Sequence, residues 1–127
     1  ARAAQLLAGS EALGMLLTAR ARRTQALLEA GDARAAAASA DEQSALGDDT
    51  LPEMMSPAEP AWIAVRAHAA VGDDERAARL LGRATEWLHR TAAEQVPAEF
   101  RDSFLHRVPV HRELLTLAAG PLLTHGR

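Results

Sequence analysis

The hydrophobic and polar positions of this chain follow a helical period that short polar turns interrupt. A serine can cap a helix by accepting a hydrogen bond from a free backbone N–H of the first turn, so Ser10 is the expected start of one helix. Its apolar face has the spacing of an amphipathic helix: Leu13, Leu16 or Leu17, Thr24, Leu27 and Leu28. Gly31 is expected to end this helix and Asp32 to cap the next, which runs to about Leu46.

A longer break follows in the middle of the chain. Residues 47–57 are rich in Gly, Asp and Pro and predict a loop between helical units. At its end, Ser56 and Glu59 have the spacing of a capping box, and Pro57 would occupy the first helical position. We therefore expect the third helix to begin at this point.

The remaining helix boundaries are marked by the same residue types. Glycine is typical of a helix C-terminus, aspartate of an N-cap, and proline of a first turn or of a break between helices. These signals predict a helix end at Gly72, a cap at Asp73 for a helix to about Gln95, a short helix opened by Pro97, and a last helix from Pro109 to about Gly120.

A repeated pattern relates these helices to one another. The run Ala3–Leu7 matches Ala77–Leu81 closely, and positions 36 and 111 fit the same register. The equivalent positions are Ala3, Ala36, Ala77 and His111, at spacings of 33, 41 and 34 residues. The longer spacing equals one period plus the loop around residues 48–57. A fixed period near 34 residues is typical of stacked helical hairpins.

The pattern resembles the second half of a tetratricopeptide repeat. Its small and leucine positions after a Gly-Asp turn are Gly72, Ala77, Leu81 and Ala84, and more weakly Gly31, Ala36 and Ala40, where Gln43 departs from the pattern. The first-helix signature is poor: its aromatic position falls on Arg20 or Ala61 and its small position on Thr24 or Val65. The resemblance implies an all-α fold, with three to four antiparallel hairpins, the first incomplete, stacked as a short right-handed solenoid.

A second resemblance lies in the tail. The segment Phe100–Leu115 is similar to one that closes the helical-repeat region of large bacterial signalling proteins, among them ATP-binding regulators of the LuxR type. The similarity extends from about Gly72 to the end. It implies that residues 1–127 form one helical domain, a C-terminal fragment of a larger cytoplasmic regulator, and it implies no ATPase or DNA-binding activity in this piece.

Composition narrows the range of partners. The net charge is −3, with 14 basic and 17 acidic side chains, so nothing favours nucleic acid or anionic lipid in general. The absence of cysteine excludes disulfides and zinc–thiolate sites. No apolar run reaches the roughly 20 residues of a membrane span, and no signal-peptide pattern opens the chain. Every basic side chain is an arginine, which fits GC-rich coding in a bacterium or an arginine-specific role.

The residues that could carry catalysis are scattered. Pro109 separates His106 from His111, and the other three histidines belong to other elements, so no cofactor or metal site is expected. The serines have no nucleophile-elbow context, and the adjacent acidic pairs do not share a helix face. We therefore expect no catalytic residue, and the chain is predicted not to be an enzyme.

One basic cluster and one surface remain as candidate sites. Arg20, Arg22 and Arg23 are expected on a solvent-facing arc, with Ala21, Thr24 and Leu28 in the apolar seam. Their expected partner is an anionic peptide or an acidic group of the same chain rather than nucleic acid. The tetratricopeptide register places five residues on the inner groove, where a partner would bind: Thr18, Gln25, Glu29, Trp62 and Arg66.

Two further alternatives concern the aromatic residues. Trp62 could instead pack under the loop at 47–57, whereas Trp87 is expected in the core. The tail carries more apolar surface than a short hairpin hides, so docking on the preceding helix pair and a homodimer surface are both open. The candidate dimer residues are Phe100, Phe104, Leu114 and Leu117.

The function that follows is a non-catalytic protein–protein interaction domain of a bacterial signalling or transcriptional regulator. It would mediate dimerisation or relay between domains of the same chain, and its partner would be a protein or peptide. The alternative is a helical domain that senses a small effector bound between hairpins, which rests on analogy with the family.

Overall fold

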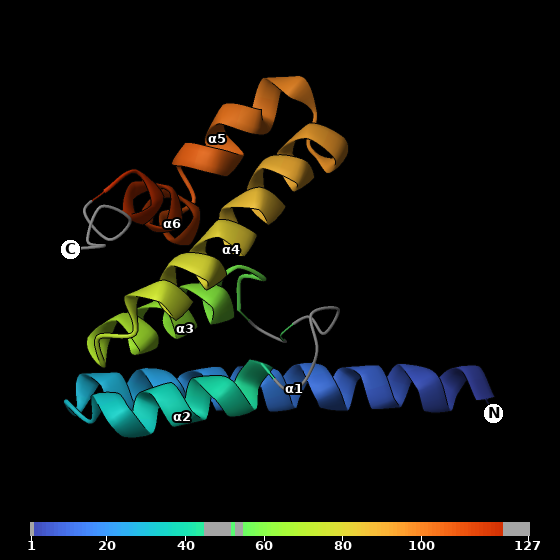
Figure 1. The fold of residues 1–127 in the computed structure, drawn as a ribbon. Helices are drawn as coiled ribbons and strands as arrows, with labels where there is room; N and C mark the ends of the chain where they lie inside the picture. Colours follow the sequence, from blue (N-terminus) through green and yellow to red (C-terminus); the bar gives the residue numbers. More distant parts are fainter. Residues whose placement is uncertain (1, 45–51, 53–54, 121–127) are drawn as a thin grey trace.

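The computed structural model describes the backbone of residues 2–44, 52 and 55–120, and side chains from residue 12 onward. All regular secondary structure in these ranges is helical, which confirms the all-α class. The helices are α1 (Arg2–Glu29), α2 (Ala33–Ser44), α3 (Glu59–Ala70), α4 (Asp74–Gln95), α5 (Arg101–His106) and α6 (Pro109–Ala119), with a 3-10 turn at Ala98–Phe100 before α5 (Figure 1).

The two Gly-Asp turns have the same structure. Gly31 and Gly72 adopt φ angles of 81° and 82°, in the left-handed region that only glycine enters without strain. In each turn the aspartate N–H donates to the carbonyl five residues earlier, that of Leu27 at 2.9 Å and that of His68 at 3.0 Å. The glycine thus ends one helix and reverses the chain, as in a Schellman motif.

The aspartates then start the next helices. A carboxylate oxygen of Asp32 accepts from the N–H of Ala35 at 3.1 Å, and one of Asp73 accepts from that of Arg76 at 3.2 Å. Both N-caps predicted from the sequence are confirmed. Each satisfies a backbone donor that the helix itself leaves free, an effect of about 1 kcal/mol.

The predicted N-cap at Ser10 is wrong. Helix α1 runs without a break through Gly9 and Ser10, so the incomplete first hairpin is not formed. An interior glycine costs about 1 kcal/mol and serine less, and the flanking Ala, Leu and Gln residues favour a helix. Among the described glycines only Gly31 and Gly72 have the positive φ of a turn. Ala3 lies on α1, but its side chain is outside the described residues.

The predicted capping box at Ser56 is also wrong. Helix α3 starts at Glu59 with Ala58 as its N-cap, and no side chain caps it. The N–H of Glu59 donates to the main-chain carbonyl of Ser56 at 3.0 Å. A helix starting at Pro57 would have put Pro60 where the first intrahelical donor is needed, and proline has none. The later start places Pro60 in the first turn, where its missing N–H costs nothing.

The helices pack as two hairpins and a third, shorter unit. Helices α1 and α2 lie antiparallel, and α3 packs on both of them and pairs with α4. Helix α6 then packs on α4, α5 and α3 (Figure 1). The predicted loop at 47–57 joins α2 to α3, and residues 47–51, 53 and 54 of it are outside the described residues, as are Leu46 and Pro121.

Two apolar clusters form the core. Four buried alanines, with partly buried leucines, join the first hairpin to the second and allow a close approach of the backbones: Ala36, Ala40, Ala64 and Ala67. Larger side chains fill the space between α3, α4 and α6: Ala58, Val65, Ala77, Leu81, Ala84, Leu88 and Leu114. The equivalent positions Ala36, Ala77 and His111 are all buried, so the sequence register identifies inward-facing positions.

In the part of the chain that the structure describes, none of the helices combines the length and apolarity needed to cross a bilayer.

Candidate functional site

Trp62 and Arg66 form a stacked pair on α3. They lie one helical turn apart, which puts both side chains on the same face. The guanidinium carbon of Arg66 lies over the Trp62 ring at 4.6 Å from its centroid, a cation–π geometry. Both side chains are half-buried, and Trp62 packs in part against the core cluster between α3, α4 and α6. The pair therefore has an inner side fixed against the core and an outer side that is partly exposed. The alternative that Trp62 packs under the loop at 47–57 concerns residues that lie largely outside the described ranges.

Apart from this stacking, Arg66 has no partner in the part of the chain that the structure describes. Among the residues that the structure describes, none accepts a hydrogen bond from its guanidinium or forms an ion pair with it. This sets Arg66 apart from several of its neighbours in the fold, because Arg20, Arg22, Arg23 and Arg76 all pair with acidic side chains. A guanidinium keeps five donors in a planar fork, so Arg66 retains its binding capacity.

Gln25 is linked to the start of α3 through Arg22. The Nη1 of Arg22 donates to Oε1 of Gln25 at 2.9 Å and forms an ion pair with Glu59 at 2.7 Å. Helices α1 and α3 run in the same direction (Figure 1), so this pair sets their relative register. Three residues further along each helix come Gln25 and Trp62.

Thr18 and Glu29 have weaker links to this region. The hydroxyl of Thr18 donates to the carbonyl of Gly14 at 3.1 Å, so it is engaged within its own helix. Glu29 is the exposed last residue of α1. The structure thus brings Trp62 and Arg66 together and connects Gln25 to the same helix pair. No described contact joins Thr18 or Glu29 to the pair.

The candidate dimer surface needs one correction. Leu114 is 0% exposed because it packs in the core between α4 and α6, so it is not a surface residue. Phe104 and Leu117 also pack in part against this core, and the Phe104 ring lies 4.5 Å from that of His111. Phe100 is 57% exposed. Packing on the preceding helices therefore accounts for most of the tail's apolar side chains, and Phe100 is the candidate that stays exposed to solvent.

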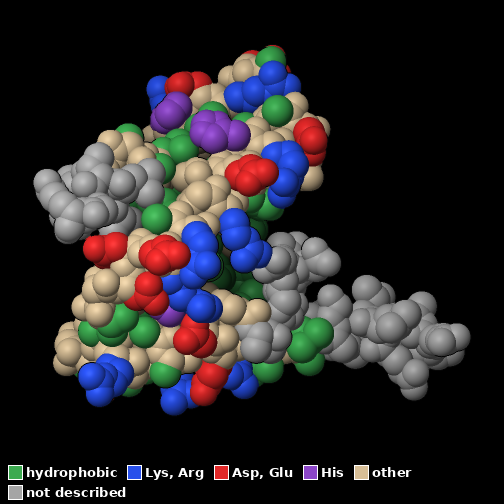
Figure 2. All heavy atoms as spheres, viewed as in Figure 1, with side chains coloured by type: hydrophobic (Ala, Val, Ile, Leu, Met, Phe, Trp, Pro, Cys, Tyr) green, Lys and Arg blue, Asp and Glu red, His purple; other side chains and the backbone are tan. Residues whose placement is uncertain are grey.

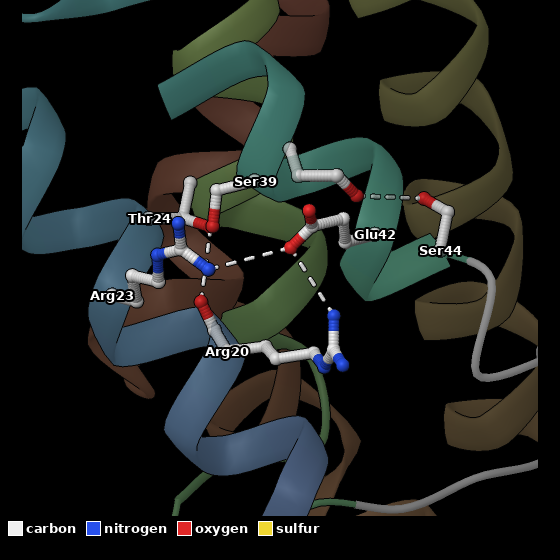
Figure 3. Close-up of polar contacts among 7 residues, drawn as sticks. Arg20, Arg23, Thr24, Ser39, Glu42 and Ser44 are labelled. Carbon is white, nitrogen blue, oxygen red and sulfur yellow. Dashed lines mark hydrogen bonds and ion pairs between the residues drawn. The ribbon is translucent and has the colours of Figure 1, made fainter. Parts of the chain in front are cut away.

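The arginine cluster of α1 is paired within the chain. Arg20 and Arg23 both contact Oε2 of Glu42 on α2, at 3.2 and 3.4 Å (Figure 3). Beneath them a hydrogen bond of 2.8 Å links the buried hydroxyls of Thr24 and Ser39. Of the partners expected for this cluster, the acidic group of the same chain is the one observed. Acidic and basic side chains also alternate on the face shown in Figure 2.

A polar cluster around the buried His68 is not predicted from the sequence. Oδ1 of Asp41 lies 2.8 Å from Arg76 Nη2 and 3.4 Å from His68 Nε2, and these residues come from α2, α4 and α3. His68 is almost fully buried, and this burial lowers the pKa of its imidazole below the ordinary 6.5, although Asp41 opposes the change. A separate buried hydrogen bond of 2.8 Å runs from Gln43 to the carbonyl of Pro60. For this bond the sequence gives a signal, because Gln43 is a polar residue at a position where the repeat has a small one.

The described side chains near the middle of α1 include exposed apolar ones. Leu13 is exposed, contrary to its expected place on a buried face, and Met15 is 64% exposed. Leu16 and Leu17 were alternatives for the next position of that face, and of the two Leu17 is buried and Leu16 is exposed. In Figure 1 the N-terminal half of α1 extends beyond the helices that cover its other half, which explains the difference. The periodicity of the sequence indicates which face of a helix is apolar, but not how much of its length other helices pack against.

Comparison with protein-family models, with curated proteins and with solved structures gives no match for this chain.

Proposed function

We propose that this chain is a non-catalytic protein–protein interaction domain whose binding surface is centred on Trp62 and Arg66. In this proposal it belongs to a bacterial signalling or transcriptional regulator, where it relays contacts between domains or mediates dimerisation. The observation that carries the proposal is the stacked pair itself. Tryptophan and arginine are the residue types most enriched at the energetic centres of protein interfaces.

The architecture we propose is a short right-handed solenoid of tetratricopeptide-like hairpins. Three features support it: the two Gly-Asp turns have the same hydrogen bonds, Ala36 and Ala77 occupy equivalent buried positions, and α3 packs on both helices of the preceding hairpin. Stacked hairpins of this kind expose the first helix of each hairpin on one curved surface. Helix α3 would be such a helix, and Trp62 and Arg66 lie on it.

Affinity capture with matched variants tests this function. The purified chain is immobilised, and proteins retained from an extract of the source cells are quantified by mass spectrometry. Trp62→Ala and Arg66→Glu are expected to abolish retention of the partner, whereas Arg79→Glu, the same charge reversal at an exposed position on α4, is expected to retain it. Circular dichroism establishes that each variant is folded. Equal retention by all four proteins would remove the surface assignment.

Dimerisation through the tail is a second candidate, and exposed Phe100 favours it. One exposed aromatic among partly buried apolar neighbours is a small surface, so we expect weak, concentration-dependent association. Light scattering over a range of concentrations, with Phe100→Ser as the comparison, measures this. A monomer at every concentration would leave the Trp62 surface as the only proposed interface.

A further inference from the structure

The chemistry of the Trp62–Arg66 pair defines the kind of partner it fits. The guanidinium of Arg66 is held over an aromatic ring at 4.6 Å, which restricts a long side chain that is otherwise flexible. Ordering it before binding reduces the entropy lost when a partner arrives. Its donors are free among the described residues. The group that matches a planar pair of N–H donors is a carboxylate.

We propose that this pair recognises an acidic peptide segment of a partner protein, in which an Asp or Glu carboxylate binds Arg66 and an adjacent apolar side chain packs on the exposed part of Trp62. This inference rests on the proposed function and adds the class of partner to it.

The charges around the pair favour a single carboxylate over a polyanion. A nucleic acid requires several unpaired cations along one surface. Arg22, on the neighbouring helix, is neutralised by Glu59, and Arg20 and Arg23 share Glu42. The chain as a whole carries a net charge of −3. A guanidinium that is unpaired within the described ranges and stacked on an indole therefore fits one acidic side chain with an apolar neighbour.

A displayed library of random dodecapeptides, selected on the wild-type chain, is the probe. The enriched peptides are expected to carry Asp or Glu next to a large apolar residue more often than the starting library. Binding of one enriched peptide is then followed by indole fluorescence in a Trp87→Phe background, where Trp62 is the only indole. Trp87 packs against the core, and replacement by Phe keeps an aromatic side chain there.

Matched substitutions identify the contact. Arg66→Gln is expected to weaken the peptide about tenfold, the usual effect of losing one charge-assisted hydrogen-bonded pair. Changing the peptide's Glu to Gln should do the same, and the two changes together should cost little more than either one. Arg66→Lys should recover only part of the loss, and Arg79→Gln should change nothing. Raising the salt concentration should weaken the wild-type complex.

The possible failures separate the two proposals. Enriched peptides without acidic residues, or acidic peptides that bind Arg66→Gln as well as wild type, would overturn the inference. If those peptides still lose binding on Trp62→Ala, the interaction surface stands and only the acidic preference falls. Peptides insensitive to both positions would remove the surface as well. A selection that enriches nothing on the wild-type chain also counts against the inference.

Discussion

Arg22 of α1 and Glu59 of α3 form an ion pair at 2.7 Å that joins the first helical hairpin to the second. The two residues are far apart in sequence, and Glu59 is the less exposed of the two. The pair lies next to Gln25 and one turn before Trp62, so it fixes the relative register of the two helices that are proposed to form the binding surface.

Breaking this pair should destabilise the fold modestly. Arg22→Met leaves the carboxylate of Glu59 partly buried without its partner, so we expect the free energy of unfolding to fall by about 1 kcal/mol. This loss is smaller than that for a fully buried ion pair, because Arg22 is half exposed and water screens the interaction. Arg23→Met, on the same helix, should cost less than about 0.5 kcal/mol, since its pairing with Glu42 is exposed. Urea unfolding measures both, and equal losses would show that the Arg22 pair has no special role.

The buried alanines between the hairpins should not tolerate a larger side chain. Ala36 is fully buried in the alanine cluster that joins α2 to α3. Ala36→Leu is expected to cost about 1–3 kcal/mol or more, because the added methyl groups separate two backbones that pack closely. The control is Ala38→Leu, two residues away on the exposed side of the same helix, where no loss is expected. A tolerated Ala36→Leu would mean that the hairpins do not pack through these alanines.

Replacing a glycine by alanine should change the stability in opposite directions at two positions. Gly72 has a φ of 82°, so Gly72→Ala is expected to destabilise the chain by about 1 kcal/mol through backbone strain, although nothing crowds the new methyl group. Gly82 lies within α4 with open space where a Cβ would be, so Gly82→Ala should stabilise the chain by about 0.5–1 kcal/mol. Thermal unfolding of the two variants decides between these signs, and a shift in the same direction for both contradicts the assigned backbone conformations.

The chain should become less stable as the pH drops below neutral, and part of this loss should depend on His68. Burial lowers the pKa of its imidazole in the folded chain below the ordinary value of 6.5, with Asp41 and Asp73 opposing this and Arg76 adding to it. The unfolded chain therefore takes up the proton first as the pH falls. The contribution is fully present above about pH 6.5 and is lost as the pH drops through the folded-state pKa, at no more than about 1.4 kcal/mol per pH unit.

Unfolding titrations between neutral and mildly acidic pH test this. His68→Gln should flatten the dependence on pH, whereas His89→Gln, at an exposed position of α4, should leave it as in the wild type. An unchanged pH profile in His68→Gln would assign the dependence to other groups.

Local signals in the sequence were sufficient for the helices and for several of their ends. The turns at Gly31 and Gly72, and the caps formed by the aspartates that follow, could be predicted because a positive φ and a capping carboxylate depend on only a few consecutive residues. The seam at Ala36 and Ala77 was predicted because it recurs. The predicted caps at Ser10 and Ser56 were wrong because of neighbouring residues. Strong helix formers on both sides of Ser10 continue the helix through it, and Pro60 shifts the start of α3 away from Ser56.

Long-range contacts were the part that the sequence did not predict. The ion pair of Arg22 and Glu59, and the cluster of Asp41, His68 and Arg76, depend on how α1, α2, α3 and α4 are set against one another. Leu114 is a candidate for a dimer surface because the tail carries many apolar residues, and only the packing of α6 against α4 shows that this one is covered. That Trp62 and Arg66 share one helix face follows from their spacing of four residues, which is a local property.

Site-specific photo-crosslinking in the source organism tests the central claim most directly. A photo-reactive amino acid replaces Trp62 in one version of the protein, Arg79 in a second and Phe100 in a third. The account predicts an adduct with a partner protein, or with another domain of the same chain, at position 62 and none at position 79. An adduct at position 100 alone would move the interface to the tail, and equal adducts at positions 62 and 79 would contradict a specific binding surface.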